Sequence, residues 1–339
     1  MNALDAKGVK HFFSQNAIYI ILVLLIIGIA VADPNFIGIT TLRDILLQSS
    51  TRVIIALGVA FVLITGGTDL SAGRIVGLSA VVSASMLQMS DYPRKFFPNL
   101  PELPIIVPIV LAIVVGLIFG LINGIIVAKF HVPPFIATLG SMVIVYGVNS
   151  FYFDMKPNQS QPIGGLSKEF SKLGTGYIGP NGTYSIPYIV IIAIVVSFIV
   201  WVIFNNTRLG KNMYAIGGNI QAANVSGINV SRNLIYIYAI AGALYGLAGV
   251  LEAARTGGAT NNYGNMYELD AIAACVVGGV STAGGVGRVR GILAGVLIFS
   301  VINYGLTFVG VSPYWQLIIK GMIIVAAVAF DIRKYVAKK

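Results

Sequence analysis

The stretch RLGKNMYAIGGNIQAANVSGINVSRN (208–233) is a polar island between two long apolar runs. Asn219 is suited to capping the start of a short helix, and Gly227 stands where such a helix ends in a left-handed residue. The island contains arginine and lysine but no acidic residue, so the positive-inside rule places it on the cytoplasmic side of a membrane. We interpret residues 205–232 as a cytoplasmic coupling loop that carries one compact helix.

Small residues around this helix indicate a smooth surface that a second protein can approach closely. Ala222, Ala223 and Val225 provide a small apolar face beside the Gly217-Gly218 pair. The alternative is an ordinary solvated loop, the common role of a polar connection. We predict a docking site for a cytoplasmic partner, formed by Gly217, Gly218, Asn219, Ala222, Ala223, Ser226 and Gly227.

The composition excludes an ordinary soluble protein. Of 339 residues, 57% are hydrophobic and only 10% are charged, which is typical of an integral membrane protein. The net charge of +10 gathers in the loops predicted to be cytoplasmic, so it indicates topology and an anionic lipid surface rather than a nucleic-acid partner. The single cysteine, Cys275, and two distant histidines predict neither a disulfide, a metal site nor a cofactor.

Apolar runs predict an all-α polytopic membrane protein with about ten passes and both termini in the cytoplasm. The first run, residues 17–32, resembles a signal peptide, but we interpret it as a retained first span because further spans follow. Residues 1–339 are predicted to form a single transmembrane permease domain, with residues 153–186 as a periplasmic loop. The remaining runs are 53–66, 74–90, 104–128, 134–152, 187–204, 233–254, 269–283, 291–310 and 315–330.

Two apolar runs, 53–65 and 271–277, are shorter than the roughly 20 residues that a full span requires. Each is followed by Gly-Gly and then by Ser, Gly and Arg, in GGTDLSAGRIVG (66–77) and GGVSTAGGVGRVRG (278–291). Broken or re-entrant segments of this kind, recurring in two halves of a chain, indicate a substrate pathway. The alternative is a pair of tight surface loops. The pathway prediction includes Asp69, Ser71, Gly278 and Gly279.

A second internal similarity predicts two pseudo-symmetric halves. At a fixed offset of 180, residues in the region of 119–142 match residues in the region of 299–322. On the predicted topology these segments enter the membrane from opposite sides, as inverted repeats do. The matches include Asn123 and Asn303, amides that suit sugar hydroxyls but equally suit hydrogen bonds between helices. The full pairs are Phe119, Ile122, Asn123, Pro133 and Met142 with Phe299, Ile302, Asn303, Pro313 and Met322.

Intramembrane charges are candidates for a proton relay. Asp69, Glu252 and Lys320 qualify, but no two of them share a helix at a face-sharing spacing, so a proton-coupled carrier is not supported. No catalytic motif is present, and the nearest approach to a phosphate-binding loop, Gly210-Lys211, is followed by Asn. We therefore predict a transport subunit that is not an enzyme; an ion-coupled carrier and a membrane scaffold are the alternatives.

Several segments resemble the membrane permeases of bacterial ABC importers for monosaccharides, the ribose and galactose group. They are YAIGGNIQAANVSGINV (214–230), TGGTDLSAG (65–73) and LDAIAACVVGGVSTAGG (269–285), while FIATLGSMVIVYGVNSFYFD (135–154) and INYGLTFVGVSPYWQ (302–316) resemble its galactose/methyl-galactoside branch. The resemblance implies a homodimer in the inner membrane, a cytoplasmic ATP-binding subunit docked on 214–230, and a periplasmic sugar-binding protein. Where the family usually has Glu-Ala-Ala in the docking helix, this chain has Gln221-Ala222-Ala223.

Overall fold

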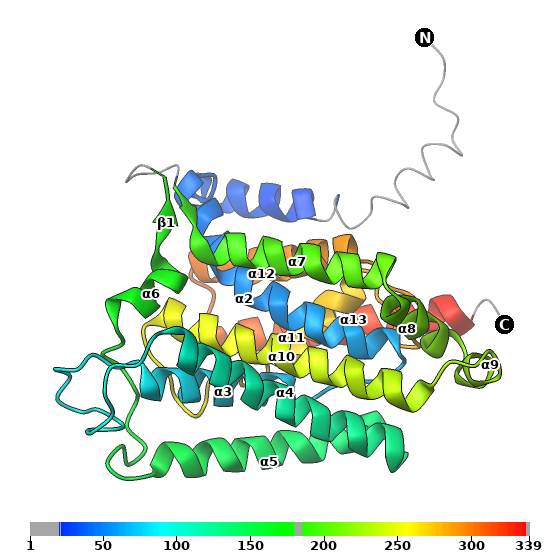
Figure 1. Cartoon of the computed structure of the whole chain (residues 1–339). Helices are drawn as coiled ribbons and strands as arrows, with labels where there is room; N and C mark the ends of the chain where they lie inside the picture. Colours follow the sequence, from blue (N-terminus) through cyan, green and yellow to red (C-terminus); the bar gives the residue numbers. More distant parts are fainter. Residues whose placement is uncertain (1–19, 21, 180–184, 337–339) are drawn as a thin grey trace.

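The computed structural model describes residues 20, 22–179 and 185–336. The described residues form a helical bundle with one two-residue antiparallel hairpin, and the helices lie side by side across the molecule (Figure 1). Leu22–Ala32 is helical; residues 17–19 and 21 of the predicted first span, and the chain ends, lie outside the described residues. The other elements are η1 Pro34–Phe36, α2 Ile39–Ile64, α3 Ala72–Met86, α4 Ile106–Lys129, α5 Pro134–Asp154, α6 Lys168–Thr175, β1 Tyr177–Ile178, β2 Ile186–Pro187, α7 Tyr188–Asn206, α8 Arg208–Gly218, α9 Ile220–Val225, α10 Val230–Thr256, α11 Tyr267–Val277, α12 Val289–Phe308 and α13 Pro313–Val336.

The chain is a multi-pass membrane protein. Among the described residues, six helices are long and apolar enough to cross a membrane, namely α2, α4, α5, α7, α10 and α12. Shorter apolar helices fill three more of the predicted passes, at Leu22–Ala32, Ala72–Met86 and Pro313–Ala329. The total of about ten passes and the inverted-repeat relation stay predictions; the matching asparagines fall on α4 and α12.

The prediction that the run at 53–65 is too short to cross the membrane is wrong. It is the second half of α2, which has 26 residues and a length of about 39 Å. The sequence-based prediction missed the residues of α2 before position 53 because several of them are polar or charged. Other helices provide partners for these residues: Tyr304 donates a hydrogen bond to Asp44 at 3.2 Å, and Arg52 pairs with Asp270. A helix packed inside protein can carry such residues, and a hydropathy reading then underestimates its length.

The prediction that the second segment, 271–277, is too short for a full span is confirmed. Helix α11 has 11 residues, and residues 257–266 before it form a loop of turns and irregular backbone. This loop leaves the end of α10, pairs with Ile163 through Ala259, and then passes along α5, where Asn149 donates to the Asn261 carbonyl at 3.3 Å. Its Gly264 packs against Gly73 in the first turn of α3. The loop therefore re-enters the bundle and delivers α11 to the interior.

Helix α10 lies at the centre and packs against α2, α3 and α4. Glycines make the α4 contact close: a Cβ added to Gly116 or Gly120 would overlap the backbone of α10 at Gly242 or Tyr238. Small residues permit this close approach between membrane helices, whose association depends on van der Waals packing rather than on the hydrophobic effect. Gly116 and Gly120 therefore serve close packing of α4 on α10.

The two principal connecting regions lie at opposite ends of the bundle (Figure 1). Helices α8 and α9 gather at one end, and α6 with β1 gathers at the other. The predicted periplasmic loop, 153–186, is partly folded, because Ser167 caps α6 and Gly174 packs against the last turns of α10 at Ala254 and Arg255. Residues 180–184 of that loop lie outside the described residues.

Candidate functional site

The helix predicted between Asn219 and Gly227 is present as α9. The Asn219 side chain accepts a hydrogen bond from the Ala222 backbone N–H at 3.0 Å, which caps the first turn. At the other end, Ile228 N–H donates to the Ala223 carbonyl at 3.0 Å, and Gly227 adopts the left-handed conformation with φ of 80°. The local signals in the sequence therefore describe this element correctly.

The exposed face of α9 differs from the face predicted from the sequence, which consisted of Ala222, Ala223 and Val225. Ala223 is only 3% exposed, because it points back into the chain, whereas Ala222, Ser226 and Gly227 are exposed. Val225 is 91% exposed and Ile220 is half-exposed, so the apolar surface offered to solvent comes from these two larger residues. Ile220 was missed by sequence reasoning, since its direction depends on how α9 sits against α8.

Helix α8 connects α9 to the ends of two other elements. A Cβ on Gly217 would overlap the Ile64 carbonyl oxygen at the end of α2, and Gly285 donates its N–H to that same carbonyl at 2.8 Å. The Tyr214 hydroxyl donates to the Gly287 carbonyl at 2.9 Å. Burial raises the pKa of Tyr214 against the opposing effect of Arg288, so this hydroxyl keeps the proton that it donates. Gly218 has open space around it.

The two Gly-Gly pairs noted in the sequence end their helices in the same way. Gly66 after α2 and Gly279 after α11 have φ of 80° and 83°, and the following N–H groups donate back to Val62 and Cys275. This is the hydrogen-bond pattern of a Schellman stop, for which glycine is suited. Gly278 serves close packing instead, since its Cβ would overlap the Gly291 carbonyl of α12.

Three of the predicted pathway residues form one buried network. Asp69 accepts hydrogen bonds from the Ser71 backbone N–H at 2.9 Å and from the Ser71 hydroxyl at 2.6 Å, and the Asn123 amide donates to the Ser71 oxygen at 2.9 Å. Asp69 is 1% exposed, and Ser71 and Asn123 are completely buried. The network ties the α2–α3 connection to α4, inside the packed bundle.

Asn303 belongs to a different cluster. It lines a small cavity of about 20 Å³, enough for about one water molecule, together with Arg52, Asp270 and Ser300. Asp270 pairs with Arg52 at 3.2 Å and with Lys320 at 3.3 Å, which joins α11 to α2 and α13. Sequence reasoning noted Lys320 but missed Asp270 and Arg52, although each is a charge at the edge of an apolar run.

The buried Glu252 carboxylate has an ion-pair partner and two hydroxyl donors. Arg255 pairs with it at 2.7 Å, and the hydroxyls of Thr51 and Tyr267 donate to it at 2.9 and 3.1 Å. The Arg52 guanidinium lies 3.6 Å from the centre of the Tyr267 ring, so the Glu252 and Asp270 clusters adjoin. Paired in this way, these residues connect α2, α10, α11 and α13.

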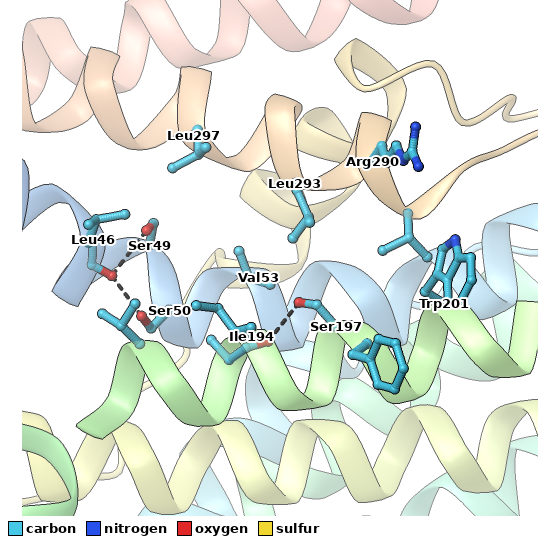
Figure 2. A pocket seen from close by; sticks show the side chains of 14 residues that line it. Leu46, Ser49, Ser50, Val53, Ile194, Ser197, Trp201, Arg290, Leu293 and Leu297 are labelled. Atoms are coloured by element: carbon cyan, nitrogen blue, oxygen red, sulfur yellow. Dashed lines mark hydrogen bonds between the residues drawn. The ribbon is translucent and has the colours of Figure 1, made fainter. Parts of the chain in front are cut away.

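The groove between α2, α7 and α12 is apolar. Its volume is about 530 Å³, and Figure 2 shows Leu293 and Leu297 of α12 across from Ile194 of α7. Its hydroxyls are turned onto their own helices: Ser197 donates to Ala193, and Ser50 donates to Leu46. A groove whose serine hydroxyls are engaged on their own helices and whose charged group, Arg290, stands at one end suits an acyl chain better than a sugar.

Comparisons with known proteins agree along the whole chain. The family model described as "Branched-chain amino acid transport system / permease component" matches residues 41–328. The chain is 53% identical to the galactose/methyl galactoside import permease protein of Haemophilus influenzae and 52% identical to that of Escherichia coli, with all of each chain covered. It is 38% identical to the ribose import permease protein of Escherichia coli, over 98% of this chain and all of that protein.

No solved structure matches the chain. The alignments with the galactose/methyl galactoside import permeases nevertheless include residues 205–232 and the loop 153–186, because they cover the whole chain. The chain therefore belongs to the permease-component family that includes the galactose/methyl galactoside and ribose import permeases.

Proposed function

We propose that this chain is the membrane-spanning subunit of an ATP-driven importer that carries galactose or a methyl galactoside across the bacterial inner membrane. The names of its full-length relatives support the substrate. The observation that carries the mechanism is the position of α9: it stands at one end of the bundle with Val225 91% exposed, while Gly217 at its base packs against the end of α2. An exposed apolar residue on a capped helix fits a protein partner.

A separate cytoplasmic subunit supplies the ATPase activity in this proposal. The chain has no phosphate-binding loop, so the work of hydrolysis must enter through a surface. Movement of α9 would be transmitted by α8 to Ile64, and through Gly285 and Gly287 to the loop between α11 and α12. Those elements hold the broken segment, whose rearrangement would open the pathway to one side and then to the other.

A second copy, a periplasmic sugar-binding protein and lipid complete the proposed assembly. Helix α5 leaves most of its apolar residues exposed, including Phe135, Val143 and Phe151, and so offers a face for a second copy. The end that carries α6 would receive the binding protein, with both termini of the chain in the cytoplasm. The groove of Figure 2 offers a place for an acyl chain, beside Arg290 at one end.

Uptake of radiolabelled galactose into vesicles tests the transport proposal. We expect uptake that needs ATP hydrolysis, the ATP-binding subunit and the sugar-binding protein. Uptake that survives ATP depletion but is abolished by an uncoupler would identify an ion-coupled carrier instead. A chain that retains the ATP-binding subunit but never moves sugar would be a scaffold.

A pair of substitutions tests the docking surface. Val225→Asp places a charge on the exposed face of α9 and should reduce retention of the ATP-binding subunit at least tenfold in a pull-down. Val309→Asp makes the same change at a half-exposed position at the end of α12 and should leave retention unchanged. Equal retention by both variants would show that the ATP-binding subunit does not dock on α9. Ala223 is unsuitable for this purpose because it is buried.

A further inference from the structure

Arg74 joins three elements at the point where the re-entrant loop meets α11. It is the one residue between Ser71 and Ala80 that is not buried. Its guanidinium donates to the Asn265 side-chain oxygen at 2.6 Å and lies 4.3 Å from the centre of the Tyr146 ring. Tyr146 belongs to α5, and Asn265 is exposed at the end of the loop 257–266. Segments distant in sequence therefore form one polar surface.

Beside this surface lie polar atoms that lack a partner. Glu268, in the first turn of α11, is 6% exposed, and its Oε2 has no hydrogen-bond partner among the described residues. It lies against Gly73, next to Arg74, because a Cβ at Gly73 would overlap it. The Nη1 atom of Arg74 is likewise unpartnered within the described part of the chain. Unsatisfied buried acceptors and donors are costly, so these atoms indicate a polar ligand.

The depth of the surface excludes lipid as its neighbour. Tyr146 lies near the middle of α5, a helix long enough to span the membrane, and it is 40% exposed. An arginine and an amide facing hydrocarbon at this level would be expensive, and irregular backbone at membrane depth is tolerated only inside protein or along a water-filled cavity. The loop enters from the end of the bundle that carries α6, since Ala259 pairs with Ile163 there.

We propose that Arg74, Asn265 and Glu268 form a contact site for the hydroxyl groups of the transported monosaccharide, halfway along its path. The guanidinium donates, the carboxylate accepts, and the amide can do both, which matches the mixed hydrogen-bonding of a sugar. Tyr146 is a positioning residue that holds the guanidinium over its ring. This inference rests on the proposed import of a monosaccharide, and it moves the point of contact away from the buried Asp69, Ser71 and Asn123.

Thiol labelling tests access to the site. Asn265→Cys introduces a reactive position, while the native Cys275 is completely buried and should not react. In vesicles with the complete importer, a hydrophilic methanethiosulfonate reagent should label residue 265 and lower galactose uptake at least fivefold. Sugar-loaded binding protein with ATP should slow the labelling. Phe151→Cys, on the exposed apolar face of α5, is the control and should not be labelled.

Transport by substituted proteins tests the contact itself. Asn265→Ala and Arg74→Gln should each lower galactose uptake at least fivefold while stimulation of the ATPase by the binding protein remains. Unchanged uptake in both variants, or a residue 265 that the reagent cannot reach, overturns the site and leaves a dry contact with a second copy. Failure of the proposed function looks different, because uptake by the unsubstituted chain would then be independent of ATP.

Discussion

Gly217 of α8 packs directly onto the carbonyl of Ile64, the last residue of α2, at a place where no side chain fits. Gly285 donates its N–H to the same carbonyl at 2.8 Å. Helix α8, the end of α2 and the loop after α11 thus meet at one atom. This contact gives α9 a short mechanical connection to the broken segment of the bundle.

Gly217→Ala should uncouple transport from ATP hydrolysis. The added methyl group displaces α8 from α2, and overpacking of this kind costs about 1–3 kcal/mol. Galactose uptake should fall at least tenfold relative to the ATP hydrolysed. Gly321→Ala, on α13, is the control, because nothing lies within 4 Å of its Cβ position, and it should behave as the natural chain does. Equal coupling in both variants would show that the contact does not transmit movement.

Gly120→Ala should destabilise the bundle. Its Cβ would overlap the Tyr238 carbonyl of α10, so α4 and α10 must separate at a cost of about 1–3 kcal/mol. We expect a lower apparent melting temperature in detergent, by several degrees. Gly321→Ala, on α13 with nothing within 4 Å of its Cβ position, should leave the melting temperature unchanged or raise it slightly. Identical melting of the two variants would contradict close packing of α4 on α10.

Asp270→Asn should cost more stability than the loss of either cation. The carboxylate forms salt bridges with Arg52 and Lys320, whose side chains are 31% and 22% exposed, and its removal breaks both salt bridges at once. We expect a loss of about 2 kcal/mol, below the range for a fully buried pair because water reaches these groups. Lys320→Met keeps the Arg52 pair and should cost under about 1 kcal/mol. Thermal unfolding of the purified variants measures the difference.

Asn123→Leu separates the two roles that its amide suggested. The hydrogen bond to Ser71 favours the structural role, so the variant should lose about 1 kcal/mol of stability while uptake per folded molecule is retained. A large loss of uptake with an unchanged melting temperature would instead indicate that Asn123 contacts the substrate. The melting curve and the uptake rate are therefore measured on the same preparation.

Much of the local structure could be predicted from the sequence. Asn219 and Gly227 bound α9 because capping depends on residues a few positions apart. Most of each apolar run coincides with a helix for the same reason, since hydropathy is a property of consecutive residues, although the runs 74–90 and 269–283 extend past the ends of α3 and α11. The start of α2 was missed because its polar residues are satisfied by Asp270 and Tyr304, far away in the chain.

By itself, then, the sequence determined the membrane class, the family, the caps of α9 and the short α11, all of which depend on neighbouring residues. Only the tertiary structure decided that Ala223 points inward, that Gly217 meets Ile64, and that Arg74 meets Asn265 across 191 positions of the chain. These contacts depend on the rotation and depth of each helix in the bundle. Packing between distant segments sets both quantities, and no local pattern records them.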